Sequence, residues 1–405
     1  MTSDRILRHA LPHQEHPMNY FPLTTEQQDW QERVADLAAR EIGPRAAEYD
    51  AKGAFPQASL DALKREGLFA LRAPKEYGGL GADLLTTCLV VEEISKKCPS
   101  TAMCFKMHLE ATDILTLIPT PYQLEHFVKP LARGEVFATV AGSETSGTTG
   151  DDWRPSTAGP STFPRANGQI IIDNVRKSYV TSAGHATHYT MFGIVEGMHT
   201  EGPANLLVVA ADQVEWEVVG AWHGLGMRGN SSAPMRFNGT VPEEHVLGPD
   251  QPTVVLWDKY LGPVLILTYG AAYLGIAAGA FELACVEGAR RYPSGARRID
   301  SPINQRRMAE LSAQVEAARA LLHAAASAAD QGRITSVLPL LQAKVTCAEV
   351  AIKVTQELMT MFGGTAFAGR LPFERYFRDA RAGMVMGVAN DQAFQRIGGL
   401  LFPDN

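Results

Sequence analysis

Apolar residues recur at helical intervals towards both ends of the chain, whereas the middle holds short β-branched runs. In the first part, one apolar stripe consists of Trp30, Val34, Leu37 and Ile42. The intervals between these positions are close to the period of a helix, which is about 3.6 residues, so the four residues fall near one helix face. The glycine-rich segment 77–81 interrupts the pattern as a loop. Residues 24–136 are therefore predicted to form an N-terminal helical domain, preceded by an extension over residues 1–23.

The middle of the chain, residues 137–250, is predicted to be a β domain. Its β-branched runs cover residues 169–173, 206–210 and 214–219. Such runs, bounded by turn signals, are typical of strands. Asn167-Gly168, directly before the first run, is a hairpin-turn signal.

Helical periodicity returns in residues 251–405. The clearest stripe consists of Met308, Leu311, Val315, Ala318 and Leu322. Its 3-4-3-4 spacing suits a helix packed in a bundle. Another helix is expected from about residue 340 to 361, with Gly363-Gly364 as its stop. The order of helical domain, β domain and helical bundle predicts an α+β fold.

Composition and charge exclude several classes of protein. Hydrophobic residues make up 45% of the 405, enough for a large core, and a net charge of −7 offers no basic surface for nucleic acid. The five cysteines form no C-x-x-C pair, which argues against a metal site. Charged residues and prolines near the N-terminus do not suit a signal peptide. The apolar stretch 261–280 contains glycines and is expected to be a buried helix, so we expect a cytoplasmic protein that does not enter membranes.

One dinucleotide-binding pattern is present but is not expected to act as one. Residues 224–229 satisfy G-x-G-x-x-G. Such glycines hold a phosphate only where they join a strand to a helix N-terminus. Here the next residues, 230–237, contain Pro234 and lead into a strand. The context therefore argues against a Rossmann site.

Several short strings, in their order along the chain, point to one family. They are Glu76-Tyr-Gly-Gly-Leu-Gly81, Ser143-Glu144-Thr145, Lys177-Ser-Tyr-Val-Thr-Ser182, Gly226-Met-Arg-Gly229, Val241-Pro-Glu-Glu-His-Val-Leu-Gly248, and Gly363-Gly364 followed by Glu374-Arg-Tyr-Phe-Arg-Asp379. From about residue 24 to 402 the chain resembles the acyl-CoA dehydrogenase superfamily of flavoproteins. The resemblance implies two helical domains flanking a β domain, with FAD at domain and subunit junctions of a homotetramer or dimer.

The resemblance also implies which residues hold the flavin ring. The matching positions are Val140, Ser143, Tyr179 and Thr181. Thr181 would hydrogen-bond the N5–C4=O edge while Tyr179 packs against the ring, because a reduced flavin needs donors at that edge. The alternative for both is an ordinary strand pair. Thr149 and Val388 are candidate substrate contacts, and no metal is expected.

The chain departs from the family at the catalytic base. Most members carry a Glu in the loop after the Arg-Asp-Ala string, and the matching position here is Gly387, which cannot take a proton. A minority place the base on the first long helix of the C-terminal domain, where residues 264–268 contain no carboxylate. Neither Asp258 nor Asp391 can be assigned the role. The chain thus resembles a divergent member that lacks the usual Glu.

The adenylate half of the flavin site is also altered. Arg291, Gly363 and Gly364 match the family, but a Phe and two Gln are replaced around Ser294, Ser301 and Thr360. Fewer contacts imply a weaker hold on the AMP moiety, which suits loosely bound FAD or FMN.

Three functions follow. The first is oxidation of an acyl thioester, carried on CoA or a carrier protein, with an electron-transfer flavoprotein as a possible partner. The second is a two-component monooxygenase, which uses O2 and exchangeable reduced flavin from a flavin reductase and needs no base. The third is a non-enzymatic flavoprotein that serves as a binding partner.

Two groups on one predicted helix bear on these alternatives. His108 is a candidate hydrogen-bond donor for an oxygenating flavin, or else a helix histidine packed at a domain junction. Lys106 and Glu110 are i,i+4 partners and are expected to form a solvated pair.

Overall fold

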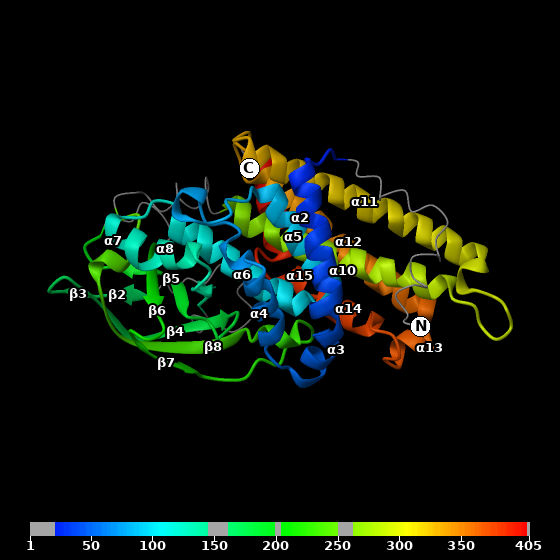
Figure 1. The fold of residues 1–405 in the computed structure, drawn as a ribbon, viewed down its shortest axis with the longest axis horizontal. Coiled ribbons are helices and arrows are strands. Elements are labelled where there is room, and N and C mark those ends of the chain that lie inside the picture. The colour runs from blue at the N-terminus through cyan, green and yellow to red at the C-terminus, as the bar shows by residue number, and fades with distance from the viewer. Residues whose placement is uncertain (1–20, 145–160, 199–203, 250–261, 403–405) are drawn as a thin grey trace.

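The computed structural model describes residues 21–144, 161–198, 204–249 and 262–402. Figure 1 shows β-sheets at one end of the molecule, long helices extending to the other end, and most of the N-terminal helices between them. The α+β class and the order of the three parts are confirmed. One core cluster includes residues of all three parts, so the parts pack as a continuous body.

The N-terminal part is helical, as expected. Its helices are α2 (Thr25–Leu37), α3 (Gly43–Lys52), α4 (Gln57–Arg65), α5 (Leu84–Lys97), α6 (Pro99–Thr116), α7 (Pro121–Gln123) and α8 (Lys129–Ala132). Thr24 and Gln27 form the capping box that starts α2. Helices α5 and α6 are buried over nearly their whole length, polar side chains included.

The central part contains two sheets. The first has the order β1 (Ala138–Ala141), β5 (His188–Val195), β6 (Asn205–Ala210) and β9 (Val246–Leu247), with β2 (Thr162–Phe163) also on β5. The second has the order β3 (Arg165–Ala166), β4 (Gln169–Val180), β8 (Ala233–Pro242) and β7 (Glu215–Val218). Strand β1 pairs in parallel with β5, and β4 pairs antiparallel with β8.

The C-terminal part is a bundle with short helices at its end. They are α10 (Gly262–Ala289), α11 (Pro302–Asp330), α12 (Leu338–Phe362), α13 (Gly364–Phe367), α14 (Phe373–Ala380), α15 (Ala382–Val385) and α16 (Asn390–Leu401). Four of the five predicted stripe residues on α11 are buried. Helix α10 is long and apolar enough to cross a membrane, but 83% of its apolar window is buried in the protein, as expected for a core helix.

The segment with the G-x-G-x-x-G pattern joins the three parts of the molecule. It runs into a 3-10 turn and then β8, not into a long helix, which confirms the exclusion of a Rossmann site. The Met227 N–H donates to Asp379 Oδ1 at 2.6 Å. Arg378 forms a two-pronged ion pair with Asp50 of α3, at 2.6 and 2.8 Å. The Arg378-Asp379 string thus ties all three parts together.

Candidate active site

The ends of β1 and β4 bring the predicted flavin residues into one place. The Thr139 hydroxyl donates to the Thr181 carbonyl at 2.7 Å. Beyond it, the Ser178 N–H donates to the Ser143 carbonyl at 2.9 Å. The four positions that these hydrogen bonds hold together are Val140, Ser143, Tyr179 and Thr181. The strand ends that carry these residues therefore lie side by side, and their role as flavin contacts stays a prediction.

An exposed aromatic ring on β4 offers a surface for a planar cofactor. Tyr179 is 59% exposed although residues 177 and 180 on the same strand are buried. The Trp222 ring lies 6.5 Å from it, edge to face. Thr181 is buried, and its hydroxyl shares a 2.9 Å hydrogen bond with Ser232. An open ring beside a hydroxyl pair fits an isoalloxazine, which needs a flat apolar contact and a polar edge.

A buried lysine anchors this part of β4. Lys177 donates to the Phe192 carbonyl at 2.6 Å and forms an ion pair with Glu144. Burial lowers the pKa of Lys177. The Lys177–Ser182 string thus combines an anchor with the candidate ring contacts. Thr149, the predicted substrate contact, lies outside the described residues.

Side chains of two helices, α10 and α12, hydrogen-bond the backbone around Gly387. Lys344 of α12 donates to the carbonyls of Gly383 and Val388, at 3.0 and 2.7 Å, and to Asn390 Oδ1 at 2.7 Å. Tyr273 of α10 donates to the Met386 carbonyl at 3.1 Å. Burial lowers the pKa of Lys344 to about 8. Sequence reasoning missed Lys344, although a lysine within the apolar run 340–348 was a usable signal.

Gly387 itself lies against an aromatic ring. Its φ is +75°, and a Cβ atom there would lie 2.8 Å from Cδ2 of Tyr269. Tyr269 follows directly after residues 264–268, the helix segment where the alternative base was sought. Sequence reasoning also missed this residue. Among the described residues 382–389, which comprise α15 and the loop after it, none carries a carboxylate.

His108 is a helix histidine packed at a domain junction, which is the second of the two expected readings and not the flavin donor. It is fully buried. Nε2 donates to the Phe69 carbonyl at 2.8 Å, and Nδ1 accepts from the Ala138 N–H at 3.1 Å. Burial lowers the pKa of His108 to about 4, so the ring is neutral with both nitrogens engaged. It has no N–H left for a flavin, and its ring joins α6 to β1.

The Lys106–Glu110 pair is not solvated, which corrects a second expectation. The two side chains are 0% and 2% exposed, and Lys106 Nζ lies 2.7 Å from Glu110 Oε2. Desolvation lowers the pKa of Lys106. The same ammonium lies 3.4 Å from the centroid of the Tyr269 ring. The i,i+4 spacing was correct, but it carries no information about burial.

The predicted adenylate contacts lie at the far end of the bundle. Arg291 follows the C-terminus of α10 and donates to the Gly295 carbonyl at 2.8 Å. Gly363 and Gly364 lie where α12 ends and α13 begins. About 20 residues of helix separate Tyr269 from this end, a rise of roughly 30 Å. Figure 1 shows α13 at the end opposite β4, so one chain does not bring both halves together.

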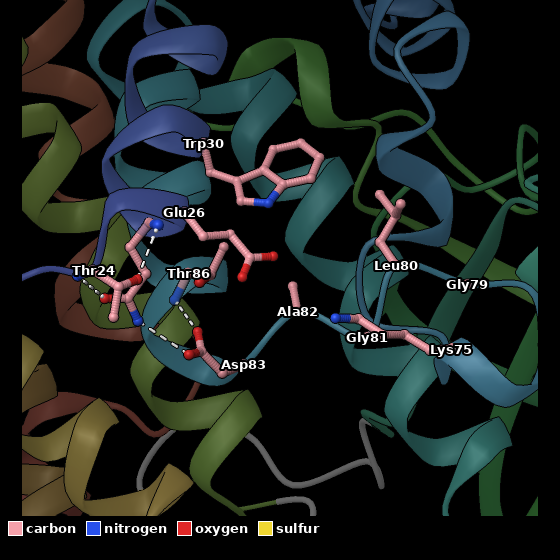
Figure 2. A pocket seen from close by; sticks show the side chains of 11 residues that line it. Thr24, Glu26, Trp30, Lys75, Gly79, Leu80, Gly81, Ala82, Asp83 and Thr86 are labelled. Carbon is pink, nitrogen blue, oxygen red and sulfur yellow. Dashed lines mark hydrogen bonds between the residues drawn. The ribbon is translucent and has the colours of Figure 1, made fainter.

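A separate cleft of about 450 Å³ lies between α2 and the loop 75–83. Figure 2 shows Trp30 above it, with the Glu26 and Lys75 side chains turned towards it from opposite sides. None of the four candidate ring contacts lines it. The cleft is therefore distinct from the candidate flavin surface.

Two family models match the chain. The model for the N-terminal domain of acyl-CoA dehydrogenases matches residues 24–135, and that for the C-terminal domain matches residues 267–395. The chain belongs to the acyl-CoA dehydrogenase family. This confirms the resemblance drawn from the short strings.

Curated relatives cover nearly the whole chain. A probable acyl-CoA dehydrogenase, FadE25 of Mycobacterium tuberculosis, is 29% identical over 365 residues, covering 89% of this chain and 91% of the relative. A 3-sulfinopropanoyl-CoA desulfinase of Paraburkholderia xenovorans is 28% identical, covering 91% and 93%. This family member is thus similar to proteins of more than one named activity.

Solved structures share the fold. Butyryl-CoA dehydrogenase of Megasphaera elsdenii superposes with a TM-score of 0.84 at 22% identity, covering 94% of this chain and 99% of that chain. FMN-bound TdsC of Paenibacillus sp. A11-2 gives 0.80 at 24%, covering 93% and 98%. Another structure of that protein is described as a dibenzothiophene monooxygenase.

Proposed function

We propose that this chain is a flavin-dependent oxidoreductase that oxidises an acyl thioester, carried on CoA or on a carrier protein. The observation that carries the proposal is the exposed Tyr179 ring beside Thr181 and the end of β1, in a family whose curated relatives include acyl-CoA dehydrogenases. Bound FAD, or FMN, supplies the acceptor for a hydride from the substrate.

The chain's own residues have three tasks at this site. Tyr179 would pack against the flavin ring, and the hydroxyls of Thr181 and Ser143 would hydrogen-bond its polar edge. The loop carrying Gly387 and Val388 borders the substrate. Because no carboxylate stands at position 387, the substrate's α-proton is either acidic enough to need little help or is taken by a displaced base. An electron-transfer flavoprotein would be the partner that accepts the electrons.

A homo-oligomer, a tetramer or a dimer, completes the cofactor site. The residues matching the ring contacts and those matching the adenylate contacts lie at opposite ends of the molecule (Figure 1). A dinucleotide that uses both sets therefore binds across two copies of the chain. Exposed apolar side chains near the C-terminus, including Phe394, Leu401 and Phe402, favour such a contact.

A second candidate is a two-component monooxygenase that takes reduced flavin from a reductase and reacts it with O2. The specific observation in its favour is Gly387 packed against Tyr269, because oxygenation requires a dry pocket and no carboxylate base. The fold shared with TdsC is compatible with it.

Anaerobic mixing separates the two candidates. The protein is reconstituted with FAD or FMN and mixed with butyryl-CoA and longer acyl-CoAs. Bleaching of the oxidised flavin band supports thioester oxidation. Absence of bleaching, together with O2-dependent turnover of supplied reduced flavin, supports the monooxygenase. A colourless protein that binds neither flavin contradicts both.

A further inference from the structure

The ring of Tyr269 occupies the space that a side chain at position 387 needs. A Cβ atom at Gly387 would lie 2.8, 3.0 and 3.1 Å from Cδ2, Cε2 and Cγ of that ring. These distances are shorter than ordinary carbon–carbon contacts of about 3.5–4.0 Å. Every non-glycine residue at position 387 therefore meets the ring with its first side-chain atom.

The Tyr269 ring is held in place on several sides. The ammonium of Lys106 lies 3.4 Å from its centroid, and that lysine is itself held by Glu110. The phenol hydroxyl lies 3.7 Å from Met107 Sδ, and the ring of Tyr273 stacks at 6.0 Å. Moving the Tyr269 ring would remove one contact from a buried ammonium, which is costly in a medium of low polarity.

The loop cannot easily withdraw from the ring either. Lys344 binds the backbone on both sides of Gly387, at Gly383 and Val388. Tyr273 binds the carbonyl of Met386, the residue directly before it. Lys106 of α6 thus contacts the ring, Lys344 of α12 holds the loop, and Tyr273 of α10 contacts both. Ring and loop meet at the one position where the family commonly has its base.

We infer that Tyr269 is a specificity-determining residue that excludes a carboxylate from position 387 and so confines this site to reactions that need no proton transfer to that loop. The steric part of the inference stands on the structure alone. Its consequence for the reaction rests on the proposed function. Tyr269 and Gly387 form a coupled pair, since a carboxylate side chain fits at position 387 only if a smaller residue also replaces Tyr269.

A double-mutant cycle in stability tests the coupling without flavin or substrate. The variants are Gly387→Ala, Tyr269→Ala and the two combined, with Tyr269→Val as a second background should Tyr269→Ala fold poorly. Gly168→Ala is the matched control, because Gly168 shares the φ of +75° but has no atom within 4 Å of its Cβ position. It reports the backbone strain alone.

Gly387→Ala is expected to raise the unfolding equilibrium constant at least tenfold more than Gly168→Ala does. In the Tyr269→Ala or Tyr269→Val background, the effect of Gly387→Ala should fall to that of Gly168→Ala. Additive effects of the two substitutions would overturn the inference, because the ring would then not be what position 387 meets.

Restoring a carboxylate tests the chemical consequence. Flavin-loaded wild type, Gly387→Glu and Tyr269→Ala/Gly387→Glu are incubated anaerobically with butyryl-CoA in D2O, and α-deuterium uptake is followed by mass spectrometry. The double variant should exchange at least tenfold faster than the other two. Exchange by wild type at the same rate, or none by a folded double variant that binds butyryl-CoA, contradicts the inference. Absence of flavin bleaching in wild type bears only on the proposed function.

Discussion

At the residue scale, burial decides what the charged and polar groups near the site can do. His108 and the Lys106–Glu110 pair were recognisable in the sequence, but their environment was not. An i,i+4 pair has the same spacing on a solvent-exposed and on a buried helix face. Only tertiary packing buries this pair. Likewise, His108 is engaged by Phe69 and Ala138, residues about 30 to 40 positions away in the chain.

Lys106→Met should destabilise the fold by about 3–5 kcal/mol, because Glu110 is left buried and unpaired. Lys106→Met/Glu110→Leu should recover most of that loss. Lys52→Met is the matched control, since Lys52 and Glu48 form an exposed i,i+4 pair whose loss should barely change stability. Chemical denaturation measures all three. Equal effects for Lys106→Met and Lys52→Met would contradict the buried pair.

His108→Ala should cost about 2–4 kcal/mol, because it orphans two backbone groups and leaves a cavity, while flavin affinity stays unchanged. His126→Ala, at an exposed histidine, is the control. The folded protein keeps His108 neutral down to about pH 4, whereas the unfolded chain takes up a proton near pH 6.5. Stability should therefore fall as the pH drops between these values, and less steeply in His108→Ala. Equal slopes would contradict the assignment.

At the element scale, periodic sequence patterns predicted the helices and strands, but they did not predict the loop conformation. The stripe on α11 and the β-branched runs identified their elements because one helix or strand period repeats within a short window. Segment 382–390 comprises α15, the loop after it and the first residue of α16. Its backbone is held by hydrogen bonds from Lys344 and Tyr273, which lie on other helices. The family strings located Gly387, but only the packing revealed Tyr269 against it.

Lys344→Met should loosen this loop without unfolding the bundle, because it removes donors from Gly383, Val388 and Asn390. Amide hydrogen exchange in segment 382–390 should accelerate at least tenfold. Lys353→Met, at an exposed lysine of the same helix, is expected to leave it unchanged. Unaltered exchange in Lys344→Met would show that other contacts hold the loop.

At the scale of the whole molecule, the three parts form one body, yet the candidate cofactor site is divided. Periodicity predicted the three parts, and the short family strings agreed with it. Strings such as Arg378-Asp379 also carry contacts that join the parts. The family strings could not show that β4 and α13 lie at opposite ends of the molecule (Figure 1), because the order of segments in a sequence does not give the distances between them in the fold.

Two variants that each lose FAD should therefore complement one another. Tyr179→Ala and Arg291→Ala remove contacts at the two ends of the proposed site. Oligomers assembled from both chains contain some sites with both wild-type ends, and these should recover tight FAD binding. Binding no better than in either variant alone would argue against a site shared between copies.

The central claim is that a flavin ring lies against the Tyr179–Thr181 strand, and a flavin titration tests it most directly. Quenching of FAD or FMN fluorescence by wild type should saturate at one flavin per chain. Tyr179→Ala should weaken binding at least tenfold, as loss of an aromatic contact of about 1.5 kcal/mol implies. Trp216→Ala, at a partly exposed ring on β7 of the same sheet, should bind as wild type does. Equal affinity of Tyr179→Ala and wild type, or no binding at all, would contradict the account.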